Sequence, residues 1–142
     1  MNRSILLATA GALALLAPSA RAETVKFHTT MNAASEVPAK QSPGTGTVDA
    51  TLDTATKKLD YTSTWQGLTG PATMAHFHGP AESGANAGVV VPWANNPSSP
   101  FKGSATLTDQ QIADLEAGKW YANVHTAANP GGEIRGQMTR AK

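Results

Sequence analysis

The clearest strand signal in this chain is the stretch Met74-Ala75-His76-Phe77-His78-Gly79-Pro80, which ends in a turn. Successive side chains of a strand point to opposite faces of its sheet. Met74, His76 and His78 are therefore predicted to share one face, with Ala75 and Phe77 on the other. The apolar face would be core and the histidine face a site. Imidazoles at alternate positions stand roughly 6.5 Å apart along a strand, a spacing from which both can reach one metal ion.

The sequence on both sides of this stretch also reads as strands. Apolar and polar residues alternate over residues 24–30, 45–53, 59–65, 101–107, 120–125 and 133–139, and residues 46–66 have the pattern of a hairpin. The continuous apolar run at residues 89–91 predicts a short buried strand that ends at Pro92. Residues 94–100 are rich in Asn, Pro and Ser, which predicts a surface loop.

One helix is predicted, over about residues 109–117. Thr108 and Gln111 have the spacing of a capping box, Ile112 and Leu115 give an apolar stripe, and Gly118 is placed to end the helix. About eight short strands with one short helix predict an all-β chain. Its architecture is expected to be an antiparallel, Greek-key-like β-sandwich or barrel.

The first 22 residues predict a secretory signal peptide. A basic start at Arg3 precedes an apolar run over residues 5–17, and Ala20-Arg21-Ala22 has the small-x-small pattern of a cleavage site. Cleavage after Ala22 would leave residues 23–142, which is enough for one domain. The expected location is the periplasm or the outside of the cell. No later stretch is apolar and long enough to predict a membrane span.

Composition narrows the possible partners. The chain has no cysteine, so neither disulfides nor a lipid anchor on cysteine is expected. Loss of Arg3 and Arg21 with the signal peptide leaves nine basic against ten acidic residues, so the formal charge changes from +1 to −1. A nearly neutral chain without basic runs argues against a nucleic-acid partner. No protein partner can be inferred from the composition.

The candidate site combines three of the four histidines. If the strands at residues 120–125 and 133–139 pair as a hairpin, His125 lies opposite Glu133 and Asn123 opposite Arg135, on the face away from the core. Should this hairpin lie beside the His-x-His strand, three imidazoles would form a metal site suited to copper or zinc. The predicted ligands are His76, His78 and His125, with Met74 as a fourth whose thioether would favour Cu(I), and the predicted neighbours are Asn123, Glu133 and Arg135.

Other interpretations of these residues stay open at this point. The histidines could be polar residues on a solvated sheet face or could close loops by hydrogen bonding. Met74 could fill a gap in the core, and Glu133 and Arg135 could form a surface pair. The thiolate of a blue-copper site is missing, and no Gly-x-Ser-x-Gly or phosphate-binding motif is present.

The same motifs resemble those of the CHRD domain, the module named after chordin. The matching segments are Ser35-Glu36-Val37-Pro38, Gly44-Thr45-Gly46, Ala75-His76-Phe77-His78-Gly79-Pro80, Gly88-Val89-Val90-Val91-Pro92, Leu115-Glu116-Ala117-Gly118-Lys119-Trp120-Tyr121-Ala122-Asn123-Val124-His125-Thr126 and Asn129-Pro130-Gly131-Gly132-Glu133-Ile134-Arg135-Gly136-Gln137. The resemblance implies a secreted domain, found in animals in an antagonist of bone morphogenetic proteins and in bacteria as single-domain exported proteins. The histidine pair is also locally similar to the copper motif of Cu,Zn superoxide dismutases.

Three functions are compatible with these features. The first is copper binding for metal handling, with zinc as the other possible ion. The second is a superoxide dismutase-like enzyme in which Arg135 guides the anion to the copper. The third is a metal-free module that binds a protein or glycan through the glycine-rich loops at residues 79–88 and 126–132. The sequence leaves open whether the protein is an enzyme.

Overall fold

The structure is a computed structural model that describes residues 21–142. The predicted signal peptide falls almost entirely on residues 1–20, outside the described part. Among the described residues, none of the helices is long and apolar enough to cross a membrane.

The described chain is all-β with one short α-helix, as predicted. A single 3₁₀ turn, η1, also follows the first strand. In chain order the elements are β1 (Thr24–Asn32), η1 (Ala33–Ser35), β2 (Thr45–Asp53), β3 (Lys58–Gln66), β4 (Ala72–His78), β5 (Val89–Asn95), β6 (Phe101–Thr106), α1 (Asp109–Glu116), β7 (Tyr121–Thr126), β8 (Ile134–Gln137) and β9 (Thr139–Arg140).

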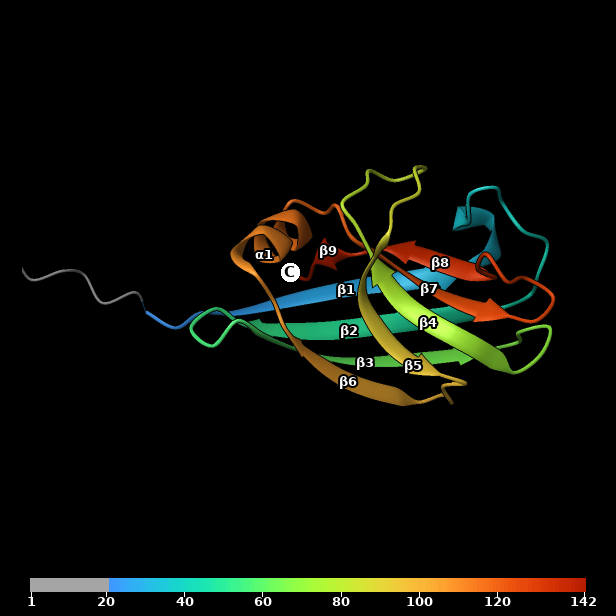
Figure 1. Ribbon diagram of the computed structural model, residues 1–142, viewed down its shortest axis with the longest axis horizontal. Coiled ribbons are helices and arrows are strands. Elements are labelled where there is room, and N and C mark those ends of the chain that lie inside the picture. Colours follow the sequence, from blue (N-terminus) through green and yellow to red (C-terminus); the bar gives the residue numbers. More distant parts are fainter. Residues whose placement is uncertain (1–20) are drawn as a thin grey trace, which may run out of the picture.

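The strands form one antiparallel sheet that curls into a nearly closed barrel (Figure 1). Their order is β5-β4-β7-β8-β1-β2-β3-β6, and β9 pairs with β1 beside β8. At the seam between β5 and β6, the rings of Trp93 and Phe101 stack with centroids 5.6 Å apart. Counted across this seam, β3 to β6 lie in the order β3-β6-β5-β4. That order is a Greek key, because β6 returns to pair with β3.

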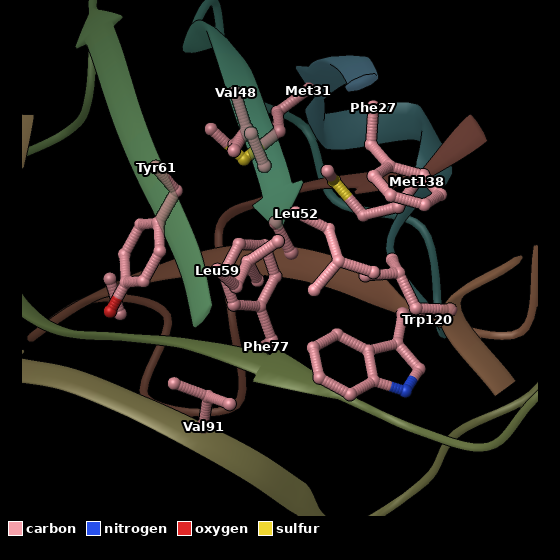
Figure 2. Packing of buried hydrophobic residues seen from close by; sticks show 14 of the residues in the cluster. Phe27, Met31, Val48, Leu52, Leu59, Tyr61, Phe77, Val91, Trp120 and Met138 are labelled. Atoms are coloured by element: carbon pink, nitrogen blue, oxygen red, sulfur yellow. The ribbon is translucent and has the colours of Figure 1, made fainter. Parts of the chain in front are cut away.

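The core lies inside the barrel (Figure 2). Phe77 has no exposed surface and packs edge-on against Tyr61, with ring centroids 5.0 Å apart, and also against Trp120 at 5.7 Å. Ala75 is equally buried, so β4 is anchored by its apolar face. This packing directs the alternate residues of β4, among them the histidines, to the outer face of the barrel.

Helix α1 begins as its sequence predicts. The Thr108 hydroxyl accepts a hydrogen bond from the Gln111 backbone at 3.2 Å, and the Gln111 side chain accepts one from the Thr108 backbone at 2.9 Å. Leu115 is buried against the core. In Figure 1 the helix lies at the end of the barrel near the turn between β2 and β3, where Asp109 pairs with Lys57 at 2.8 Å.

Strand β5 differs from its prediction in length and burial. It does not end at Pro92 but continues to Asn95, so the surface loop predicted over residues 94–100 begins later. The apolar run is not wholly buried either, since Val89 is 50% exposed while Val91 is 6% exposed. The reason is the position of β5 at the edge of the sheet, where proline is tolerated because one side of the strand needs no donor.

Candidate metal centre

Pairing of β4 with β7 brings the three predicted histidines together. The register sets Met74 opposite His125, His76 opposite Asn123 and His78 opposite Tyr121. Directly opposed residues of an antiparallel pair point to the same face. The His-x-His pair of one strand and His125 of the other therefore share the outer face of the barrel.

The imidazole nitrogens converge closely enough to hold an ion. One nitrogen from each histidine lies within 4.8 Å of the other two. The shortest separation, His76 Nδ1 to His125 Nε2, is 3.1 Å. Nitrogens bound at 2.0–2.1 Å to one metal stand roughly 3.3–3.5 Å apart. A separation at the 4.8 Å limit would thus have to close by roughly 1.3–1.5 Å on metal binding.

Backbone carbonyls fix the tautomers of two of the rings. His125 Nδ1 donates a hydrogen bond to the carbonyl oxygen of Pro130 at 2.8 Å, and His78 Nδ1 donates one to that of Ala87 at 3.0 Å. Because a carbonyl can only accept, the proton of each neutral ring is on Nδ1 and the lone pair on Nε2. A second hydrogen bond of this kind is the usual way in which proteins orient a metal-binding histidine.

All three histidines are held in the neutral form. Burial lowers the pKa of His76 to about 4, helped by the neighbouring His125 and His78. Burial also lowers the pKa of His78 and of His125, although the carbonyl hydrogen bonds act in the opposite direction. A neutral imidazole is the form that binds a metal, so little proton release opposes binding near pH 7.

Asn123 lies between two of the rings. Its Oδ1 is 3.0 Å from His78 Nε2 and 2.9 Å from His125 Nε2. The side chain is on the histidine face of β7 and is only 3% exposed. Asn123 is predicted from the sequence to neighbour the three histidines, and in the structure its side chain contacts two of them, His78 and His125.

Arg135 is close to the site but faces a loop. Its guanidinium carbon lies 3.4 Å from the centroid of the Tyr121 ring, which stacks on His78 with centroids 4.8 Å apart. Its nitrogens donate to the Asn86 side chain at 2.8 Å and to the Ala85 carbonyl. Arg135 therefore holds the loop of residues 79–88, whose Ala87 carbonyl is bonded to His78.

The low exposure of the site residues bears on two of the alternative interpretations. A solvated sheet face is excluded for His78 and His125, which are 9% and 6% exposed, whereas His76 is only partly buried. The other interpretation, loop closure by hydrogen bonding, is confirmed for His78 and His125, which bond to the carbonyls of Ala87 and Pro130. A surface pair of Glu133 and Arg135 is wrong, since these residues are 0% and 2% exposed. Loops cover this face of the barrel, and their presence could not be read from the alternation of residues within the strands.

Glu133 ties three loops together behind His125. Its carboxylate accepts hydrogen bonds from Ser42 at 2.5 Å, from the Thr69 hydroxyl at 2.7 Å and from Thr126 at 2.5 Å. Burial opposes ionisation, but the hydrogen bonds from Ser42, Thr126 and Thr69 outweigh it and lower the pKa of Glu133 to about 2. Glu133 thus helps to hold the 126–133 loop, whose Pro130 carbonyl orients His125.

Three further residues lie outside the histidine cluster. Met74 lies opposite His125 in register and is 36% exposed, so its role as a ligand stays a prediction. Glu36 was missed as a site residue, although it is 5% exposed and lies on the far side of Asn123. Its only sequence signal was its place in a motif of the family. His28, the remaining histidine, is bound to Asp49 on the exposed face of β1.

Fold and site together define an all-β barrel domain with a three-histidine cluster that could hold a metal ion. The model of the CHRD domain family matches residues 27–138, which include every strand from β2 to β8 and all three clustered histidines. The chain therefore belongs to the CHRD domain family. No curated protein and no solved structure matches it.

Proposed function

We propose that this domain binds a copper ion through His76, His78 and His125 and serves in metal handling outside the cytoplasm. The observation that carries the proposal is the convergence of three neutral imidazoles within 4.8 Å. In His78 and His125, Nδ1 donates a hydrogen bond to a backbone carbonyl, which leaves the lone pair of Nε2 for the metal ion. Such preorientation lowers the cost of forming the site.

Copper is preferred over the other first-row metals by the donor set. Imidazole nitrogens bind divalent ions in an order of affinity that peaks at Cu²⁺, with Zn²⁺ below it. No thiolate competes, because the chain has no cysteine. Zinc is the second ion to test, since three histidines with an open fourth position also suit it.

The proposed location rests on the predicted signal peptide. Export with cleavage after Ala22 would expose the domain to the metals of the periplasm or the medium. Sequencing of the amino terminus of protein recovered from those fractions should begin at Glu23. Full-length protein confined to the cytoplasm would contradict this part of the proposal.

Thermal unfolding with Cu⁺, Cu²⁺ and Zn²⁺ tests metal binding. A ligand at 100 times its dissociation constant adds about 2.7 kcal/mol to stability, which corresponds to a rise of several degrees in Tm. We expect this rise in the wild type and its loss in His125→Ala. The matched control is His28→Ala, which removes an exposed histidine outside the cluster and should keep the full rise. An unchanged wild-type Tm with all three ions would leave a metal-free binding module as the better account.

Copper-dependent superoxide dismutation is the second candidate. It is favoured by the partial exposure of His76, which leaves the cluster less covered on that side than around His78 and His125. A role of Arg135 in guiding the anion would require the 79–88 loop to open, because its guanidinium is bound to that loop. Copper-loaded protein without dismutase activity would eliminate this candidate and leave the binding function intact.

A further inference from the structure

Asn123 lies among the three histidines and contacts two of them. This residue lies on β7 opposite His76 of β4 and Arg135 of β8, at the centre of the polar face. It is 3% exposed, so its amide has little access to solvent. Its Oδ1 contacts the Nε2 atoms of both rings whose tautomers are fixed, at 2.9 and 3.0 Å.

These three atoms are all acceptors. Each Nε2 carries a lone pair, because the ring proton is used on a backbone carbonyl through Nδ1. The Asn123 oxygen has only lone pairs as well. Asn123 Oδ1 therefore faces both Nε2 atoms without a proton between them, and the one donor within reach is His76 Nδ1, which lies 3.1 Å from His125 Nε2. A bound cation would satisfy all three at once.

The surroundings of Asn123 explain why its oxygen faces the histidines. Its Nδ2 lies on the opposite side, 2.7 Å from where a Cβ on Gly132 would stand, and Glu36 Oε1 lies beside the same point. A carboxylate on this side attracts the amide hydrogens and leaves the oxygen for the rings. Burial raises the pKa of Glu36, and a side-chain hydrogen bond from Asn123 acts against this rise, which agrees with the amide group facing the carboxylate.

We propose that Asn123 Oδ1 is the fourth ligand of the ion, which gives the site three nitrogens and one oxygen. The inference rests on the proposed metal binding and replaces Met74 in the fourth position. Neighbouring donors are 2.9–3.1 Å apart along the series His76, His125, Asn123 and His78, close to the roughly 3.3 Å of a tetrahedral site. An amide oxygen is a harder donor than a thioether, so Cu²⁺ and Zn²⁺ should be favoured over Cu⁺.

Competition titrations with Cu²⁺ and Zn²⁺ test this assignment. Asn123→Ala should weaken binding by at least 10-fold, whereas Met74→Leu should leave it unchanged. If Asn123 merely competed with the metal for the imidazoles, Asn123→Ala would bind as tightly as the wild type or more tightly, and the proposal would be overturned. A wild type that binds neither ion would instead refute the proposed function itself.

A double variant separates a ligand from a positioning residue. Asn123→Asp combined with Glu36→Gln keeps an oxygen on the histidines and restores a donor on the opposite side. It should bind Cu²⁺ at least as tightly as the wild type, because the oxygen is now anionic. Affinity as low as that of Asn123→Ala would show that Asn123 only positions the rings.

The wild type offers a readout that does not depend on any variant folding. In a ¹⁵N-labelled sample, the side-chain amide resonances of Asn123 should shift as Zn²⁺ is added and stop shifting at saturation. The reason is that coordination of Oδ1 polarises the amide group and changes the environment of Nδ2. The same shift should occur in Met74→Leu. Resonances that stay in place at saturating Zn²⁺ would contradict coordination by Oδ1.

Discussion

At the scale of single residues, the site depends on where protons are held. His78 and His125 each donate Nδ1–H to a carbonyl, of Ala87 and Pro130, and this leaves Nε2 as the only binding atom of each ring. Sequence reasoning could place the histidines on one face because strands alternate. It could not assign these tautomers, because both carbonyls belong to loops far from any periodic pattern.

Gly132 is a second residue on which the site depends. Its φ of +124° is one that other residues rarely adopt, and a Cβ there would collide with Glu36 and with Asn123 Nδ2. We predict that Gly132→Ala lowers the free energy of unfolding by about 1–3 kcal/mol and weakens metal binding. Gly131→Ala is the control, since nothing lies within 4 Å of its added Cβ. Equal urea-unfolding midpoints for the two variants would contradict the prediction.

The buried histidines also predict how stability depends on pH. The pKa of His76 is lowered to about 4 in the folded protein, against about 6.5 in the unfolded chain. The unfolded state therefore binds more protons, and the metal-free protein should lose stability as the pH falls from about 6.5 towards 4. His76→Gln should show a shallower decline over this range in urea titrations at several pH values. A decline identical to that of the wild type would show that this histidine does not titrate as the structure implies.

At the scale of elements, the pairing of β4 with β7 and of β7 with β8 builds the site. The opposition of Asn123 and Arg135 was predictable, because the 126–132 loop suggested a hairpin and the alternation set its register. The neighbouring position of β4 was not, since it depends on a non-local pairing. The covering loops were also unpredicted, because side-chain hydrogen bonds of Arg135 and Glu133 hold them and no periodic pattern indicates such bonds.

A substitution of Glu133 tests whether its hydrogen bonds hold the loops in place. Its carboxylate joins the loops around Ser42, Thr69 and Thr126. In Glu133→Gln, an amide group would face these donors, so we predict a loss of about 2–4 kcal/mol in the free energy of unfolding. Glu82→Gln is the control, because that side chain is 77% exposed and its pair with Lys119 is worth about 0–1 kcal/mol. Similar stabilities of the two variants in urea would show that Glu133 does not hold the loops.

At the scale of the whole molecule, the barrel and the site use opposite faces of the same strands. β4 presents Phe77 to the core and the histidines to the outer face, and β7 does the same with Val124 and His125. The all-β class, the approximate number of strands and the short helix followed from alternation, capping and turn residues, whereas the order of the strands did not. The burial of the polar face did not, because composition gives no sign of which loops fold back over a sheet.

Copper content after equilibrium dialysis tests the central claim most directly. Protein dialysed against Cu²⁺ and then against metal-free buffer would be analysed for metal by mass spectrometry. We predict one copper ion per chain in the wild type and in His28→Ala, and none in a variant with His76, His78 and His125 all changed to alanine. Wild-type protein that retains no copper, or a triple variant that retains as much, would contradict the account.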